Sequence, residues 1–149
     1  MKGADANTIV VGIDGSKCGE EALRCAIAEA EASGRRLLIV HAWSWISDAM
    51  VTPFEKPQSK KLGAALLRRA EAEARRHGVT VQIRLFDGPA AKGLIEASHG
   101  AAMLVVGSHG YRGLQKTLLG SVSHACVQHA TCPVLVVPRR LEGTVQEGR

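Results

Sequence analysis

The 149-residue sequence has few aromatic side chains and no long apolar run. Aromatic residues make up 3% of the chain, which leaves no platform on which unpaired bases could stack. No segment approaches the ~18–20 consecutive apolar residues that a membrane-spanning helix needs. The first eight residues lack the apolar core of a secretion signal. These absences predict a cytoplasmic protein that binds neither nucleic acid nor membrane.

The cysteines do not form a recognisable metal or redox motif. No two of them make a C-x-x-C pair, and no histidine stands at zinc-finger spacing from them. A free thiol in a reducing compartment packs as a small apolar side chain. We therefore expect buried free thiols at Cys18, Cys25, Cys126 and Cys132.

The remaining composition is that of an ordinary globular chain, with 46% hydrophobic and 22% charged residues. Lys and Arg number 19 against 14 Asp and Glu, and the net charge of +5 is dispersed along the sequence. The length fits one domain. We expect a single domain over residues 1–149, with its core at about 8–139 and a polar tail at 140–149.

Short β-branched apolar runs alternate with Ala- and Leu-rich amphipathic segments. Ser16 is a good N-cap for the first helix, and Gly34 is a typical residue to end it. Apolar strands bracketed by helices are typical of a parallel sheet buried on both faces, in a doubly wound α/β fold. We expect strands at 8–13, 35–42, 79–86, 102–107 and 133–137, helices at 17–33, 59–77, 90–98 and 121–130, and an irregular excursion at 43–58.

A glycine-punctuated segment runs from the end of the fourth expected strand, at Gly107, to the start of the last helix. Its glycines let the backbone approach a ligand, and exposed N–H groups in such a loop bind anions. Arg112 and Lys116 can screen phosphate charge, and the Ser121 and Ser123 hydroxyls can cap the helix or donate to a phosphate. The spacing matches neither a P-loop nor a dinucleotide fingerprint. A phosphate site and a set of plain turns remain equal alternatives.

The spacing of Gly107, Gly110, Gly120 and Ser121 resembles the nucleotide-loop motif of the universal stress protein family, in its ATP-binding subgroup. Three other segments resemble the same family: VVGIDGS at 10–16, LLIVHA at 37–42 and CPVLVV at 132–137. The resemblance runs from about Thr8 to Arg139, nearly the whole chain.

The resemblance implies a five-stranded parallel sheet in the order 3-2-1-4-5, with helices on both faces. It also implies a homodimer formed through the last strand, Pro133 to Val137. A short apolar edge strand promotes aggregation if it is left unpaired and uncovered, so pairing of this strand with a second copy is consistent with that interface. The ligand implied is ATP, with Mg²⁺ as a possible companion, in a regulatory stress-response protein that hydrolyses it slowly at most.

The resemblance also assigns binding positions. Asp14 would meet the ribose or the phosphates, and the backbone at Ala42 would meet the adenine edge. The remaining cofactor-binding positions are Gly12, Gly107, Gly110, Arg112, Gly120, Ser121 and Val122. No residue is assigned a catalytic or metal-binding role.

Several alternatives remain open on the residues themselves. Asp14 could be a general base or a metal ligand, but a single carboxylate at a strand end is more often a ribose or turn partner. His41 is more simply a buried, hydrogen-bonded histidine than a catalytic one. The chain could instead be a nucleotide-free interaction module or a cyclic-nucleotide binder. A weak ATPase, or an enzyme that phosphorylates itself at Thr117, Ser121 or Ser123, is the remaining alternative.

Overall fold

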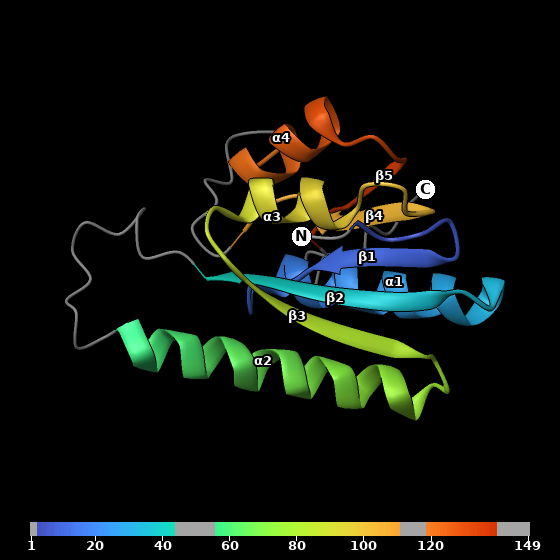
Figure 1. The fold of residues 1–149 in the computed structure, drawn as a ribbon, viewed down its shortest axis with the longest axis horizontal. Coiled ribbons are helices and arrows are strands. Elements are labelled where there is room, and N and C mark those ends of the chain that lie inside the picture. Colours follow the sequence, from blue (N-terminus) through green and yellow to red (C-terminus); the bar gives the residue numbers. More distant parts are fainter. Residues whose placement is uncertain (1–2, 44–55, 111–118, 140–149) are drawn as a thin grey trace, which may run out of the picture.

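A computed structural model describes residues 3–43, 56–110 and 119–139 of the chain. Its strands form one parallel sheet in the order β3-β2-β1-β4-β5, as the sequence predicts (Figure 1). Parallel pairing is seen at all four contacts between neighbouring strands. The strands are β1 (Thr8–Gly12), β2 (Arg36–Trp43), β3 (Val81–Asp87), β4 (Met103–Gly107) and β5 (Val134–Val137).

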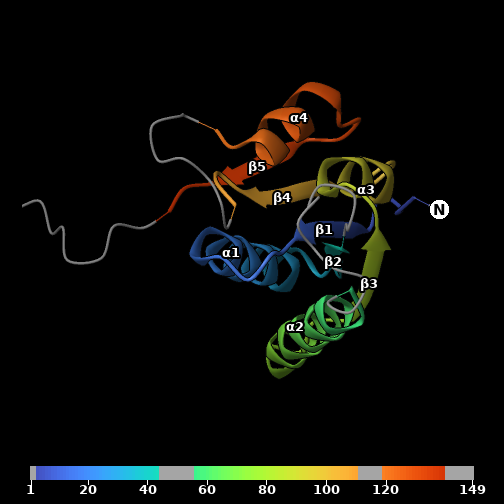
Figure 2. The ribbon, with the colours of Figure 1, turned by 90° about the vertical axis from the view of Figure 1, so that its left-hand side faces the viewer.

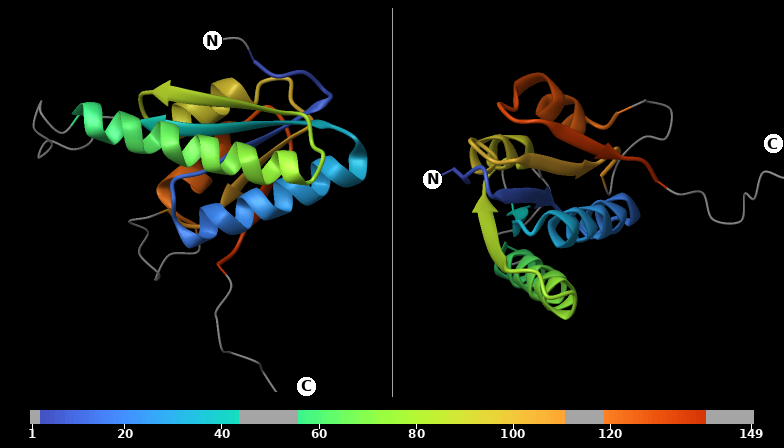
Figure 3. Two further views of the ribbon diagram at one scale, coloured as in Figure 1. Left: turned by 90° about the horizontal axis from the view of Figure 1, so that it is seen from below. Right: turned by 90° about the vertical axis from the view of Figure 1, so that its right-hand side faces the viewer.

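Within the described residues, two helices cover each face of the sheet (Figure 2). Helices α1 (Lys17–Ser33) and α2 (Lys56–Arg76) lie side by side on one face, as the view from below shows (Figure 3). Helices α3 (Ala90–Ala97) and α4 (Ser121–His129) cover the other face. The doubly wound arrangement is therefore confirmed. None of the helices in the described ranges is both long and apolar enough to cross a membrane.

The core consists of two apolar clusters, one on each face of the sheet. Successive residues of a strand point to opposite faces, so Ile9 and Val11 enter the cluster under α1 and α2, while Val10 enters the other. All four thiols are free, two of them buried and two half-buried. Burial, more than the neighbouring Cys132, raises the pKa of the Cys126 thiol to about 11, so it stays protonated within the core.

Local signals place the boundaries of α1. The Ser16 side chain accepts a hydrogen bond from the Gly19 N–H at 3.1 Å, and Gly34 closes the helix with a positive φ of 68°. Both features follow the sequence prediction.

The irregular segment that the sequence predicts at 43–58 extends too far in both directions, because residues at each of its ends belong to a strand or a helix. Trp43 belongs to β2, because it pairs with Asp87 and its carbonyl accepts from the Gly88 N–H at 2.9 Å. Helix α2 already begins at Lys56 and includes Pro57. A proline is compatible with the first turn of a helix, since its missing N–H has no partner there in any case.

Candidate functional site

The candidate site lies where β1 and β4 end side by side. From β1 the chain crosses through α1 to β2 on one side, and from β4 it crosses through α4 to β5 on the other. Ligands in open parallel sheets bind at such a reversal, beyond the carboxyl ends of the strands. The two strand ends, Gly12 and Gly107, are both among the predicted site residues.

Asp14 follows β1 and is held by the turn that starts α1. Its Oδ1 accepts from the Ser16 N–H at 2.9 Å and from the Ser16 hydroxyl. Ser16 in turn caps α1, so the carboxylate has a fixed position relative to that helix. The turn-partner interpretation of Asp14 is confirmed through Oδ1, and Oδ2 is the second oxygen of the carboxylate.

That second oxygen lies against the loop after β4. A Cβ added to Gly110 would be only 2.9 Å from Asp14 Oδ2. Asp14 Oδ2 therefore lies close to Gly110, just beyond the ends of β1 and β4. A residue with a side chain at 110 would occupy the space beside the carboxylate.

Gly12 and Gly107 have packing roles that the sequence did not reveal. A Cβ on Gly107 would lie 2.7 Å from the Cβ of Cys18 and 2.9 Å from its carbonyl carbon. A Cβ on Gly12 would lie 2.7 Å from Leu94 Cδ1. These glycines bring α1 and α3 close to the sheet, and Gly107 in particular sets the first turn of α1 beside the end of β4.

The N-terminus of α4 lies beside the same loop. The Gly120 N–H donates to the Ser108 carbonyl at 2.7 Å, and a Cβ on Gly120 would lie 3.7 Å from the Gly110 nitrogen. The first helical bond runs from the His124 N–H to the Gly120 carbonyl at 2.9 Å. The amides of the first turn, which include those of Ser121 and Val122, precede that bond and carry the positive end of the helix dipole.

The two serines of α4 differ from the prediction. Gly120 is the N-cap of α4 and no side chain caps this helix, so of the two alternatives for Ser121 the capping role is wrong. Ser121 is exposed at the helix start. Ser123 is buried, and its hydroxyl lies 2.9 Å from the Ser108 carbonyl and 3.1 Å from the Gly120 carbonyl. Because that hydroxyl is engaged inside the fold, it is no phosphate donor.

Replacing Ser123 with alanine should lower the free energy of unfolding by about 1 kcal/mol, because the buried hydroxyl loses its bonds to Ser108 and Gly120. Native-state hydrogen exchange at the Gly120 amide should also accelerate relative to amides elsewhere. Ser98→Ala is the matched control, since Ser98 is fully buried and donates to the Ile95 carbonyl. If hydrogen exchange at Gly120 accelerates equally in both variants, then Ser123 does not stabilise the loop after β4.

Ala42 lies beyond the end of β1. The ladder between β1 and β2 ends at the pair Gly12–Val40, so Ala42 is two residues further along β2. The carbonyl of Val40 accepts from the Ile13 N–H at 3.0 Å. Backbone groups alternate in direction along a strand, so the N–H and C=O of Ala42 also point to the β1 side. This geometry suits a backbone contact with a ligand that lies over the end of β1.

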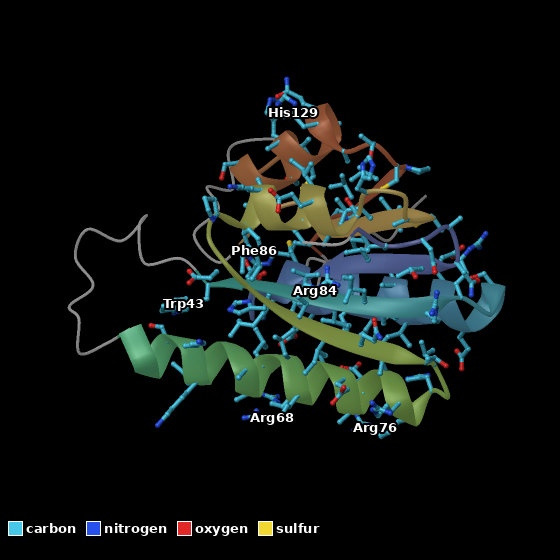
Figure 4. All side chains as sticks on the ribbon, viewed as in Figure 1. Trp43, Arg68, Arg76, Arg84, Phe86 and His129 are labelled. Carbon is cyan, nitrogen blue, oxygen red and sulfur yellow. The ribbon has the colours of Figure 1, made fainter. Side chains whose placement is uncertain are left out.

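His41 is hydrogen-bonded as predicted, but it is half-buried rather than buried. Its Nδ1 is 2.8 Å from the Ile13 carbonyl oxygen, and a Cβ on Gly63 would be 2.7 Å from its Cδ2. The ring is thus fixed between the end of β1 and α2. Trp43 and Phe86 mark the ends of β2 and β3 nearby (Figure 4).

Ser108 is the residue that the sequence prediction overlooked. Its N–H donates to the Val137 carbonyl at 2.8 Å, and its carbonyl accepts from Gly120. Its hydroxyl is 3.1 Å from His109 Nδ1 and 3.8 Å from Cys18 Sγ. Ser108 therefore ties β5, α4 and α1 to the loop. The sequence did contain a signal that could have identified Ser108, namely its position directly after a predicted buried strand.

Some predicted positions cannot be placed. Arg112, Lys116 and Thr117 lie outside the described residues. Among the residues that are described, no three His, Cys, Asp or Glu side chains gather to hold a metal ion. The described part of the site thus consists of one carboxylate, a set of glycines and the start of α4.

Comparison with known proteins identifies the family. The model of the universal stress protein family matches residues 6–138. A curated universal stress protein from Thermus aquaticus is 37% identical over 133 residues, covering 87% of this chain and 97% of the relative. A curated relative from Mycolicibacterium smegmatis is also 37% identical, over 134 residues that cover 89% of this chain, but the chain spans only 46% of its length.

Solved structures show the same fold. A family protein from Burkholderia pseudomallei has a TM-score of 0.72 and 28% identity, covering 91% of this chain and 98% of that one. A universal stress protein solved in complex with cAMP has a TM-score of 0.67 and 28% identity, covering 92% and 100% of the two chains. Structures from Archaeoglobus fulgidus with dAMP and Arabidopsis thaliana with AMP, at 24% and 20% identity, are similar in fold, with TM-scores of 0.66 and 0.64. This chain belongs to the universal stress protein family.

Proposed function

We propose that this protein binds ATP, with or without Mg²⁺, at the switch point between β1 and β4. The proposal rests on one observation: Asp14 Oδ2, Gly110 and the N-terminus of α4 lie close together. A carboxylate accepts hydrogen bonds from ribose hydroxyls, and a helix N-terminus with a glycine loop favours phosphate. One site thus offers complementary groups to both halves of a nucleotide.

The nucleotide would lie across the ends of the strands. We assign the adenine edge to the backbone at Ala42, the ribose to Asp14, and the phosphates to the loop from Gly107 to Gly110 and to Gly120, Ser121 and Val122. The position of Arg112 in the sequence fits a phosphate contact. Family structures with cAMP, dAMP and AMP support an adenine nucleotide as the ligand class.

Calorimetric titration with ATP, AMP and cAMP, each with Mg²⁺, tests the assignment. We expect ATP to bind most tightly, because its longer phosphate chain reaches the amides at the start of α4. Asp14→Asn retains the oxygen that accepts from Ser16 but loses the charge, and should weaken ATP binding by about tenfold.

Asp5→Asn is the matched control, since Asp5 precedes β1 at the opposite end of the sheet and pairs with Arg36. Tighter binding of cAMP than of ATP would favour the cyclic-nucleotide alternative. Sustained release of ADP that disappears in Asp14→Asn would favour the ATPase. An absence of heat with any nucleotide would favour the interaction module.

We further propose that the protein acts as a cytoplasmic, nucleotide-dependent regulatory homodimer that pairs through β5. This strand forms the edge of the sheet and is paired with β4 on one side. Leu135 at its centre is 39% exposed, while Val134 and Val136 are half-buried. An apolar edge strand with such exposure is suited to pairing with a second copy.

Leu135→Asp should weaken the dimer by at least about tenfold, because a charge would be buried in the interface. Sedimentation across a range of concentrations measures the dissociation constant. Leu62→Asp is the control, as Leu62 is 72% exposed on α2, which packs on β2 and β3 and so lies far from β5 in the strand order. If Leu135→Asp dimerises like the unmodified chain, the interface lies elsewhere.

A further inference from the structure

Helix α2 carries an unusual concentration of positive charge on the face that points away from the sheet. Gly63, Leu67, Ala70 and Ala74 are buried on the inner side. The outer side carries five exposed cations, and Figure 4 shows Arg68 and Arg76 directed away from the sheet. We name the outer side the basic face; its residues are Lys61, Leu62, Ala65, Arg68, Arg69, Ala72, Arg75 and Arg76.

The basic face is not neutralised by its own helix. The only carboxylates in α2 are Glu71 and Glu73, and both are half-buried at the flanks. Within the described residues, Arg75 is the one cation of this face with an ion pair, to Glu71 at 3.4 Å. An exposed charge pair of this kind contributes little to stability. The charge on this face is therefore available to an external partner.

The long side chains of the basic face are arranged in two rows with a seven-residue repeat, and all but one of them are cations. Lys61, Arg68 and Arg75 form one row, and Leu62, Arg69 and Arg76 form the other. Small side chains, Ala65 and Ala72, lie between the rows. A seven-residue repeat keeps one face of a helix directed toward a second helix along its length. Small residues between the rows allow that second helix to approach closely.

We propose that the basic face of α2 binds an acidic amphipathic helix of a partner protein. The partner's carboxylates would pair with the two rows of cations, and its small or apolar stripe would lie over Ala65 and Ala72. Leu62 is 72% exposed at the start of the second row and gives the contact an apolar anchor. Complementary charge then sets the choice of partner and the rate of encounter.

The face suits a protein helix better than a phosphate chain. It has no aromatic side chain on which bases could stack. Phosphate contacts would gain nothing from alanines between the rows, nor from an exposed leucine. The seven-residue repeat, the alanines and Leu62 all have a use when the occupant is a helix.

A designed helical peptide is the probe for this surface. It has 21 residues, the length of α2, with glutamates on both sides of a leucine and alanine stripe, and binding is read by fluorescence anisotropy. A peptide of the same composition with its glutamates spread around the helix is the control ligand. We expect the patterned peptide to bind at least about tenfold more tightly than the scrambled one.

Variants separate the proposed surface from general electrostatics. Arg68→Glu with Arg69→Glu should weaken peptide binding by at least about tenfold, whereas Lys92→Glu with Arg139→Glu, which makes the same charge change elsewhere, should alter it by less than about twofold. Ala72→Arg adds positive charge but fills the space between the rows. Helix packing predicts weaker binding in that variant, and simple charge attraction predicts tighter binding. Circular dichroism confirms that each variant is folded.

The proposal is overturned by any of three results. The first is no binding of the patterned peptide up to about 1 mM. The second is equal or tighter peptide binding by Ala72→Arg. The third is a higher affinity than the peptide's for duplex DNA of about 20 base pairs, or for vesicles containing phosphatidylserine, if Arg68→Glu with Arg69→Glu weakens that binding by the same factor.

Discussion

Replacing Gly107 with alanine should lower the free energy of unfolding by about 3 kcal/mol. The new Cβ would be 2.7 Å from the Cβ of Cys18, 2.9 Å from its carbonyl carbon and 3.0 Å from its oxygen. No rotation of the Cys18 side chain relieves these contacts, because they involve the backbone of α1. The helix must move away from β4, and Cys18 is buried there. Chemical denaturation measures the change.

Gly12→Ala is the matched control. Its added Cβ would meet Leu94 at the end of the side chain, 2.7 Å from Cδ1 and 2.8 Å from Cδ2. A leucine can change its rotamer, so the loss should be nearer to about 1 kcal/mol. Equal losses in the two variants would contradict the claim that backbone contact at Gly107 sets the distance between α1 and the sheet.

Replacing Gly110 with alanine should reduce the affinity for ATP by at least about tenfold while changing the stability by less than about 1 kcal/mol. The methyl group would lie 2.9 Å from Asp14 Oδ2. Asp14 is held through Oδ1 by Ser16, so its carboxylate has little freedom to withdraw. The change therefore displaces the oxygen that we assign to the ribose and fills the space beside it.

Gly34→Ala should give the opposite pattern, a loss of stability without a loss of ATP affinity. Gly34 has a positive φ of 68°, and a Cβ there would meet no atom within 4 Å. The backbone strain should lower stability by about 1 kcal/mol, with no change in ATP affinity. Calorimetric titration and denaturation of both variants give the comparison. ATP affinity that is unchanged in Gly110→Ala would remove Gly110 from the site.

Much of the fold could be predicted because its signals are local. The β-branched runs around Val10 and Val105, the cap at Ser16 and the glycine at 34 each specify their own element. The excursion at 43–58 was misjudged because a pairing distant in sequence decides its start: Trp43 joins β2 through Asp87 of β3. A single sequence does not display such a contact.

The candidate site was predictable in its parts but not in its geometry. Glycine spacing marks the loop after β4, yet nothing in that spacing shows that Gly107 accommodates Cys18 or that Gly110 faces Asp14. The roles of Ser108 and Ser123 also arise from contacts between separate elements. The basic residues of α2, by contrast, recur at helical spacing in the sequence, and the structure adds that the face they share points away from the sheet.

The most direct test of the nucleotide site is a native mass spectrum recorded before and after addition of ATP with Mg²⁺. We predict a dimer that gains one nucleotide mass for each chain, and a Gly110→Ala protein that remains a dimer but gains none at the same ATP concentration. A dimer of the unmodified chain that takes up no nucleotide at saturating ATP would contradict the proposal, and the loop after β4 would then serve only as a turn.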